Sequence, residues 1–111
     1  GYTNHIWNGV TTLHFAQIVW GIIQTKSYEP GVAHLVPKDM VSKYKLIEFI
    51  AKNFGRDDLI VTKFEAEKSI NRSLISVDPE RNLRMWHGGG YNEIPAIGQM
   101  LSTYANWTKI E

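Results

Sequence analysis

Polar and aromatic side chains that could contact a ligand are concentrated near the start of the chain, at Asn4, His5, Trp7 and Asn8. Carboxamides can bridge hydroxyl groups, an imidazole can donate or accept a hydrogen bond, and a flat indole face can stack on a sugar or a base. We therefore expect this segment to be a loop that faces a small polar ligand such as a nucleotide-sugar. The alternative is that Trp7 anchors the core and that Asn8-Gly9 forms a turn in which the glycine adopts a positive φ.

A second candidate for ligand binding is Arg72, in the run Asn71-Arg72-Ser73-Leu74. A planar guanidinium can hold a diphosphate through two parallel hydrogen bonds, and the hydroxyl of Ser73 could assist it. The alternative for Arg72 is an ion pair with a nearby glutamate on the surface. We predict that these six residues bind substrate and that none of them is catalytic.

Other motifs do not indicate a reaction centre. The run His87-Gly88-Gly89-Gly90-Tyr91 resembles an anion-binding loop, but the next helix is expected near Pro95 and no Gly-Lys-Ser/Thr follows, so we expect a flexible connector. The four histidines lack the spacing of helical metal ligands, so no metal site is predicted. No carboxylate pair and no Gly-x-Ser-x-Gly element can be named for acid–base or nucleophilic catalysis.

Composition narrows the class of protein. The 111 residues are 43% hydrophobic, which is enough for a core, and we predict a single domain over residues 1–111. The 12 basic and 11 acidic residues give a net charge of +1, without the concentrated basic face that nucleic acid requires. The chain has no cysteine, which fits the reducing cytoplasm. Its most apolar run, residues 18–23, is much shorter than the roughly 20 residues that span a bilayer, so no membrane contact is predicted.

The segment that follows the first candidate loop is predicted to be a helix over residues 13–23, with Thr11 or Thr12 as its N-cap. Apolar residues cover two sides of it, and only His14, Gln17 and Gln24 interrupt them. We therefore expect part of its surface to meet another domain or a second copy of the chain.

The remaining pattern predicts strands at 32–36 and 59–64, with Pro37 stopping the first. A second helix begins after Ser42 and stops at Gly55. Residues 65–90 are predicted to be mainly irregular, with a short extended piece at 72–77. A last helix has Pro95 in its first turn and an apolar face made of Ile97, Met100, Leu101, Tyr104 and Trp107. The tail Lys109–Glu111 is expected to fray. These elements indicate an α/β protein of the α+β-like kind.

The order of several runs resembles one known family. The runs TNHIWNGVTTL, GVAHLVPKDMVSKYKLIEFIAKNFG and RSL, followed by the closing helix, are similar to the C-terminal substrate-binding region of extended short-chain dehydrogenases of the dTDP-4-dehydrorhamnose reductase type. The resemblance implies a parent enzyme whose N-terminal Rossmann domain binds NAD(P)H and carries the catalytic tyrosine and lysine. The C-terminal part would close over a nucleotide-sugar, with Arg72 at its phosphates.

This chain lacks the cofactor and catalytic motifs of that family. It contains no Gly-x-Gly-x-x-Gly, and the fourth residue after Tyr44 is Glu48 rather than the lysine of a Tyr-x-x-x-Lys pair. We therefore expect no cofactor in this chain itself. Two alternatives remain open. One is a regulatory subunit that keeps the ligand and has lost the reaction. The other is a free-standing, non-enzymatic module that binds a glycan or a peptide through its tryptophans, Trp7, Trp20, Trp86 and Trp107.

Overall fold

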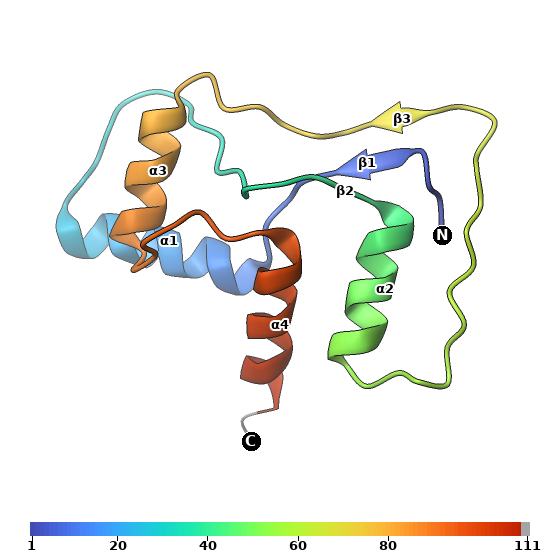
Figure 1. Ribbon diagram of the computed structural model, residues 1–111. Helices are drawn as coiled ribbons and strands as arrows, with labels where there is room; N and C mark the ends of the chain where they lie inside the picture. Colours follow the sequence, from blue (N-terminus) through green and yellow to red (C-terminus); the bar gives the residue numbers. More distant parts are fainter. Residues whose placement is uncertain (110–111) are drawn as a thin grey trace.

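The structure, a computed structural model, describes residues 1–109 (Figure 1). Over that range the elements follow the order β1 (His5–Trp7), α1 (Thr12–Thr25), β2 (Val41–Ser42), α2 (Lys43–Asn53), β3 (Ile70–Asn71), α3 (Pro79–Gly88) and α4 (Ile97–Thr108). The short strands lie along one edge of the molecule, and the helices extend away from them (Figure 1). The fold is a small mixed α/β arrangement of four helices and a three-stranded sheet in the described residues, in agreement with the predicted α+β class.

The sheet has β1 at its centre, in a segment that the sequence pattern indicated as a loop. β1 pairs antiparallel with β2, with Ile6 opposite Ser42, and parallel with β3, with Ile6 opposite Asn71. The strand predicted at 59–64 does not form; only Phe64 takes part in an isolated parallel bridge, to Tyr2.

The strand predicted at 32–36 does not form either. Side chains of α3 bind backbone groups of this segment that would otherwise pair with a neighbouring strand. Asn82 Oδ1 accepts from the Val36 N–H at 3.0 Å, and Asn82 Nδ2 donates to the Val36 carbonyl at 3.1 Å. The Trp86 indole N–H, one turn further along α3, donates to the same carbonyl at 2.9 Å. Because the N–H and the carbonyl of Val36 are both hydrogen-bonded to side chains, the segment remains a loop that is held against α3.

The first two predicted helices are confirmed with their caps. Thr11 caps α1 by accepting from the His14 N–H at 3.1 Å. Ser42 caps α2 by accepting from the Lys45 N–H at 3.1 Å. α2 ends in a Schellman motif, in which Gly55 adopts φ 65° and the Arg56 N–H donates to the Ala51 carbonyl at 2.8 Å.

The last helix is confirmed, but Pro95 lies outside it. The N-cap of α4 is Ala96, so Pro95 precedes the cap and is not part of the first turn. The Asp39 carboxylate accepts from the Ile97 N–H at 2.8 Å and so satisfies one of the backbone donors that have no partner inside the helix. The buried face consists of Ile97, Met100, Leu101 and Ala105. Of the predicted face, Trp107 is exposed. The tail that is predicted to fray begins at Lys109, which caps α4 in the structure. Its other two residues, 110–111, lie outside the described residues.

Helix α3 lies in the segment predicted to be irregular. Asp78 caps it, accepting from the Arg81 N–H at 3.0 Å, and Pro79 occupies its first turn. The glycine run that follows is not a flexible connector, because it forms the end of α3 and its crossing with α1. A Cβ added to Gly21 would lie 2.2 Å from the Gly88 carbonyl oxygen, and one added to Gly89 would lie 2.4 Å from Ile18 Cδ1.

Packing is organised as two helix pairs, α1 with α3 and α2 with α4. The buried core consists of Ile18, Val41, Trp86, Ile97, Met100 and Leu101. The described residues nevertheless form a flat body of 45 × 39 × 18 Å with a radius of gyration of 15.6 Å, against about 13 Å for a compact domain of roughly this length. Many large apolar side chains are consequently exposed. Among the described residues, no helix combines the length and the apolar character that crossing a membrane requires.

Candidate functional site

The two predicted ligand-binding segments lie side by side in the structure. β3 pairs with β1, and just beyond β3 the Arg72 N–H donates to the Ile6 carbonyl at 2.9 Å. Continuing this register places Arg72 opposite Trp7 and on the same face of the sheet, because side chains alternate along each strand. We refer to Asn4, His5, Trp7, Asn8, Arg72 and Ser73 as the β1–β3 edge.

The two asparagines of this edge hold the chain together. Asn8 is buried; its Oδ1 accepts from the Leu74 N–H at 2.6 Å and its Nδ2 donates to the Leu74 carbonyl at 2.7 Å. Asn4 does the same with Ala66, at 2.9 and 2.8 Å. Each carboxamide therefore makes the two hydrogen bonds that the backbone of a neighbouring strand would make. Together they hold the segment that carries Arg72 against β1.

Two other members of the edge also have partners within the chain. The Ser73 hydroxyl donates to Asn71 Oδ1 at 2.6 Å, in a local turn that the Ser73 N–H also joins. The His5 ring lies 4.4 Å from the Tyr2 ring, centroid to centroid. Neither group is as open to a ligand as the sequence pattern indicated.

Trp7 is half-buried and packs against the core cluster. A Cβ built on Gly9 would lie 2.1 Å from Trp7 Cζ2, so Gly9 lies directly against the six-membered ring. Gly9 is not among the positive-φ glycines, which are Gly31, Gly55 and Gly90. The glycine is therefore required by the close approach of the indole and not by the backbone angle of a turn.

The Arg72 guanidinium, like the ring nitrogens of His5 and Trp7, has no hydrogen-bond partner among residues 1–109. Its side chain is exposed, and its guanidinium makes no hydrogen bond or ion pair there. The other three arginines each pair with a carboxylate: Arg56 with Asp58, and both Arg81 and Arg84 with Glu29. An exposed, unpaired guanidinium on a fixed backbone is suited to an anion.

The tryptophans do not all belong to the surface. Trp86 is 0% exposed and belongs to the core, whereas Trp20 and Trp107 are 58% and 52% exposed. A binding surface that uses all four of these side chains is therefore ruled out for the alternative module.

A pocket that the sequence did not indicate lies beside His14. Its volume is about 270 Å³, and its walls are formed by His14, Lys38, Tyr91, Glu93, Ile94, Pro95, Gln99 and Thr103. His14 is only 1% exposed, and its Nε2 atom has no hydrogen-bond partner among the described residues. Burial lowers the pKa of His14, so the ring is neutral at pH 7. Leaving such a group unsatisfied costs about 1–3 kcal/mol.

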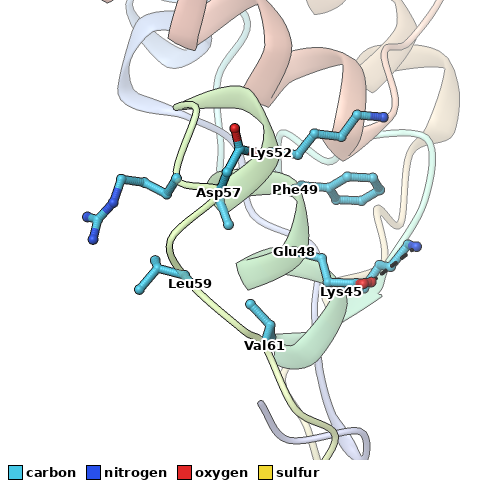
Figure 2. A pocket seen from close by; sticks show the side chains of 9 residues that line it. Lys45, Glu48, Phe49, Lys52, Asp57, Leu59 and Val61 are labelled. Carbon is cyan, nitrogen blue, oxygen red and sulfur yellow. Dashed lines mark hydrogen bonds and ion pairs between the residues drawn. The ribbon is translucent and has the colours of Figure 1, made fainter.

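A larger hollow of about 450 Å³ runs along α2 (Figure 2). Figure 2 shows Glu48 and Phe49 on the helix side and Leu59 and Val61 on the segment that follows it. The Glu48 carboxylate accepts from the Tyr44 hydroxyl at 3.0 Å and pairs with Lys45 at 3.4 Å. The Tyr44 hydrogen bond, and then Lys45, lower the pKa of Glu48, so this carboxylate is ionised and cannot act as a general acid near neutral pH.

No group of three or more histidine, aspartate or glutamate side chains in the described part of the chain is arranged to hold a metal ion. The chain matches no family model, and no curated protein or solved structure is similar to it at a significant level.

Proposed function

We propose that this chain is the substrate-binding portion of an NAD(P)-dependent reductase or epimerase that acts on a nucleoside-diphosphate sugar. The observation that carries the proposal is Arg72, an exposed guanidinium without a partner among residues 1–109, positioned beside Trp7 by the β1–β3 pairing. The similarity of the sequence runs to the dTDP-4-dehydrorhamnose reductase type supplies the substrate class and the parent enzyme.

Within this proposal the roles of the edge residues differ. Arg72 holds the diphosphate, and the exposed part of Trp7 lies beside it. Asn4 and Asn8 act as positioning residues, because their carboxamides are bonded to the backbone at Ala66 and Leu74. His5 and Ser73 contribute at the rim of the site.

The partner domain is the second part of the proposal. α1 exposes Phe15, Val19, Trp20 and Ile23, which share one side of the helix opposite the buried His14, Ile18 and Gly21. We call these four residues the apolar face of α1. In the parent enzyme the Rossmann domain, which supplies NAD(P)H and the catalytic groups, would cover this face.

Titration calorimetry with dTDP-, UDP-, GDP- and CDP-sugars tests the proposal. We expect one nucleotide to bind measurably and Arg72→Ala to weaken that binding. If no member of the set binds, the proposal fails. The purified chain is also expected to leave NADPH unoxidised in the presence of a keto-sugar nucleotide, and detectable oxidation would overturn the assignment of a binding portion.

A further inference from the structure

Residues 59–63 form an extended segment that has a free backbone edge. The run Leu59-Ile60-Val61-Thr62-Lys63 follows the turn after α2 and contains three consecutive β-branched residues, which is typical of a strand. Figure 1 shows this part of the chain along the rim of the molecule, beyond α2. The strand that the sequence predicts here is missing because no described segment pairs with its outer side.

The inner side of this backbone is bound to the start of the chain. The Thr62 carbonyl accepts from the Gly1 nitrogen, and the Phe64 N–H donates to the Gly1 carbonyl at 2.8 Å. Successive residues of an extended chain direct their backbone groups to opposite sides, so those of Val61 and Lys63 point away from Gly1. Neither of these two N–H groups has a hydrogen-bond partner within residues 1–109. The outer side is therefore an open strand edge.

The side chains of the segment alternate between two faces. Leu59 and Val61 line the hollow along α2 (Figure 2). Ile60 and Thr62 lie on the opposite face, where Ile60 is 89% exposed. An open edge that carries exposed β-branched side chains and no proline is a template for pairing with another strand. The segment is consequently suited to strand addition.

We propose that this segment pairs antiparallel with the same segment of a second copy of the chain, in a two-fold dimer with Ile60 opposite Ile60. In this register Val61 lies opposite Leu59, and its N–H donates to the Leu59 carbonyl, which has no donor within the described residues. Lys63 lies opposite Asp57 in the same register. Neither of these charged groups forms an ion pair within residues 1–109, and the two-fold axis pairs them twice.

Other antiparallel registers lack this charge complementarity. Two residues face each other only if their backbone groups point to the same side, so the residue opposite a given one changes in steps of two. Val61 opposite Val61 would place Asp57 against Glu65, which repel each other. Thr62 opposite Thr62 would place Lys63 against Val61 and leave its charge uncompensated. The dimer uses no residue of the β1–β3 edge, so it does not depend on the function proposed there.

Single cysteines test the register, since the chain has none of its own. Every variant also carries Trp20→Glu, so that the apolar face of α1 does not contribute. Ile60→Cys places the two thiols at one cross-strand pair, where Cβ atoms are about 4.5–5.5 Å apart, and oxidised glutathione should link them into a covalent dimer. Thr62→Cys is on the same face, but its two copies lie about 13 Å apart along the strands, so it should link at least about tenfold more slowly. The proposal is overturned if Ile60→Cys links no faster than Thr62→Cys.

A charge exchange tests the choice of partner by sedimentation equilibrium. Lys63→Asp and Asp57→Lys each place like charges opposite one another in both symmetric pairs, and each should weaken dimerisation by about tenfold. The double variant restores both attractions and should return to within about threefold of the parent. Lys68→Asp makes the same change in net charge outside the paired residues and should have no effect. A double variant that dimerises as weakly as the single ones would contradict pairing with a second copy in this register.

Discussion

The carboxamide of Asn8 pairs with both backbone groups of Leu74, accepting at 2.6 Å and donating at 2.7 Å across 66 residues of sequence. The same two-bond pairing joins Asn82 to Val36 and Asn4 to Ala66. Strands of two or three residues have few ladder bonds of their own, so these side chains hold the long loops against the sheet and the helices. The exposed guanidinium of Arg72 depends on two of these three pairings for its position.

Asn8→Ala is predicted to lower the free energy of unfolding by about 1–3 kcal/mol, because it leaves the N–H and C=O of Leu74 without partners in a partly buried place. Urea denaturation measures the change. The control is Asn71→Ala, which removes only exposed local bonds to Ser73 and should cost no more than about 0.5 kcal/mol. Equal losses in the two variants would contradict the role given to Asn8.

Gly21→Ala is predicted to destabilise the protein even though it lies inside a helix. Alanine is favoured over glycine there by about 1 kcal/mol, but its Cβ would lie 2.2 Å from the Gly88 carbonyl oxygen, which belongs to backbone and cannot rotate away. We expect a net loss of about 1–3 kcal/mol in thermal or urea unfolding. Gly88→Ala meets nothing within 4 Å and should be neutral or slightly stabilising. A stabilising Gly21→Ala would mean that α1 and α3 do not cross at this distance.

Stability is predicted to fall at acid pH partly through His14. Burial lowers the folded-state pKa of His14 below its ordinary value of 6.5, so the unfolded chain binds the proton first. The contribution of His14 to the free energy of unfolding is therefore fully present above pH 6.5, and it is lost as the pH falls from 6.5 towards the lowered pKa. Lys38, Glu93 and Tyr91 line the same pocket and are unchanged in His14→Phe, which should show a smaller loss over this interval. Parallel pH profiles for the two proteins would rule out the contribution of His14.

The apolar face of α1 is predicted to make the isolated chain self-associate. Phe15 is 56% exposed, and α1 carries no charged residue to oppose contact between copies. Sedimentation velocity over increasing concentration should show a growing dimer or larger species, and Trp20→Glu should reduce it. Trp107→Glu places the same charge on α4 and should have little effect. A monomer at all concentrations would count against an unpartnered face on α1.

The parts of the fold that could be predicted are those specified by neighbouring residues. Thr11 and Ser42 as caps and Gly55 as a stop are local signals, and they place α1 and α2 correctly. α3 has a local signal as well, because Asp78-Pro79-Glu80 is typical of a helix start, but these residues lie in the stretch 65–90 that lacks a helical period and is predicted to be mainly irregular.

The strands and the His14 pocket could not be predicted in the same way. β1, β2 and β3 are two or three residues long and are defined by pairing between distant segments. His14 interrupts the apolar pattern of α1 like a surface residue, and its burial depends on Trp86 and Tyr91, which come from α3 and the loop after it. Arg72 is a candidate from its place in an irregular stretch of the sequence, but only the fold shows that the other three arginines have carboxylate partners.

Binding of the diphosphate by Arg72 is measured by the ratio of dissociation constants between Arg72→Ala and the unchanged chain, determined by calorimetry with the nucleoside-diphosphate sugar that binds best. A paired, charge-assisted contact predicts a ratio of at least about ten. Arg56→Ala, whose guanidinium pairs with Asp58 in its own turn, should give a ratio near one. A ratio near one for Arg72→Ala as well would mean that Arg72 does not hold the diphosphate.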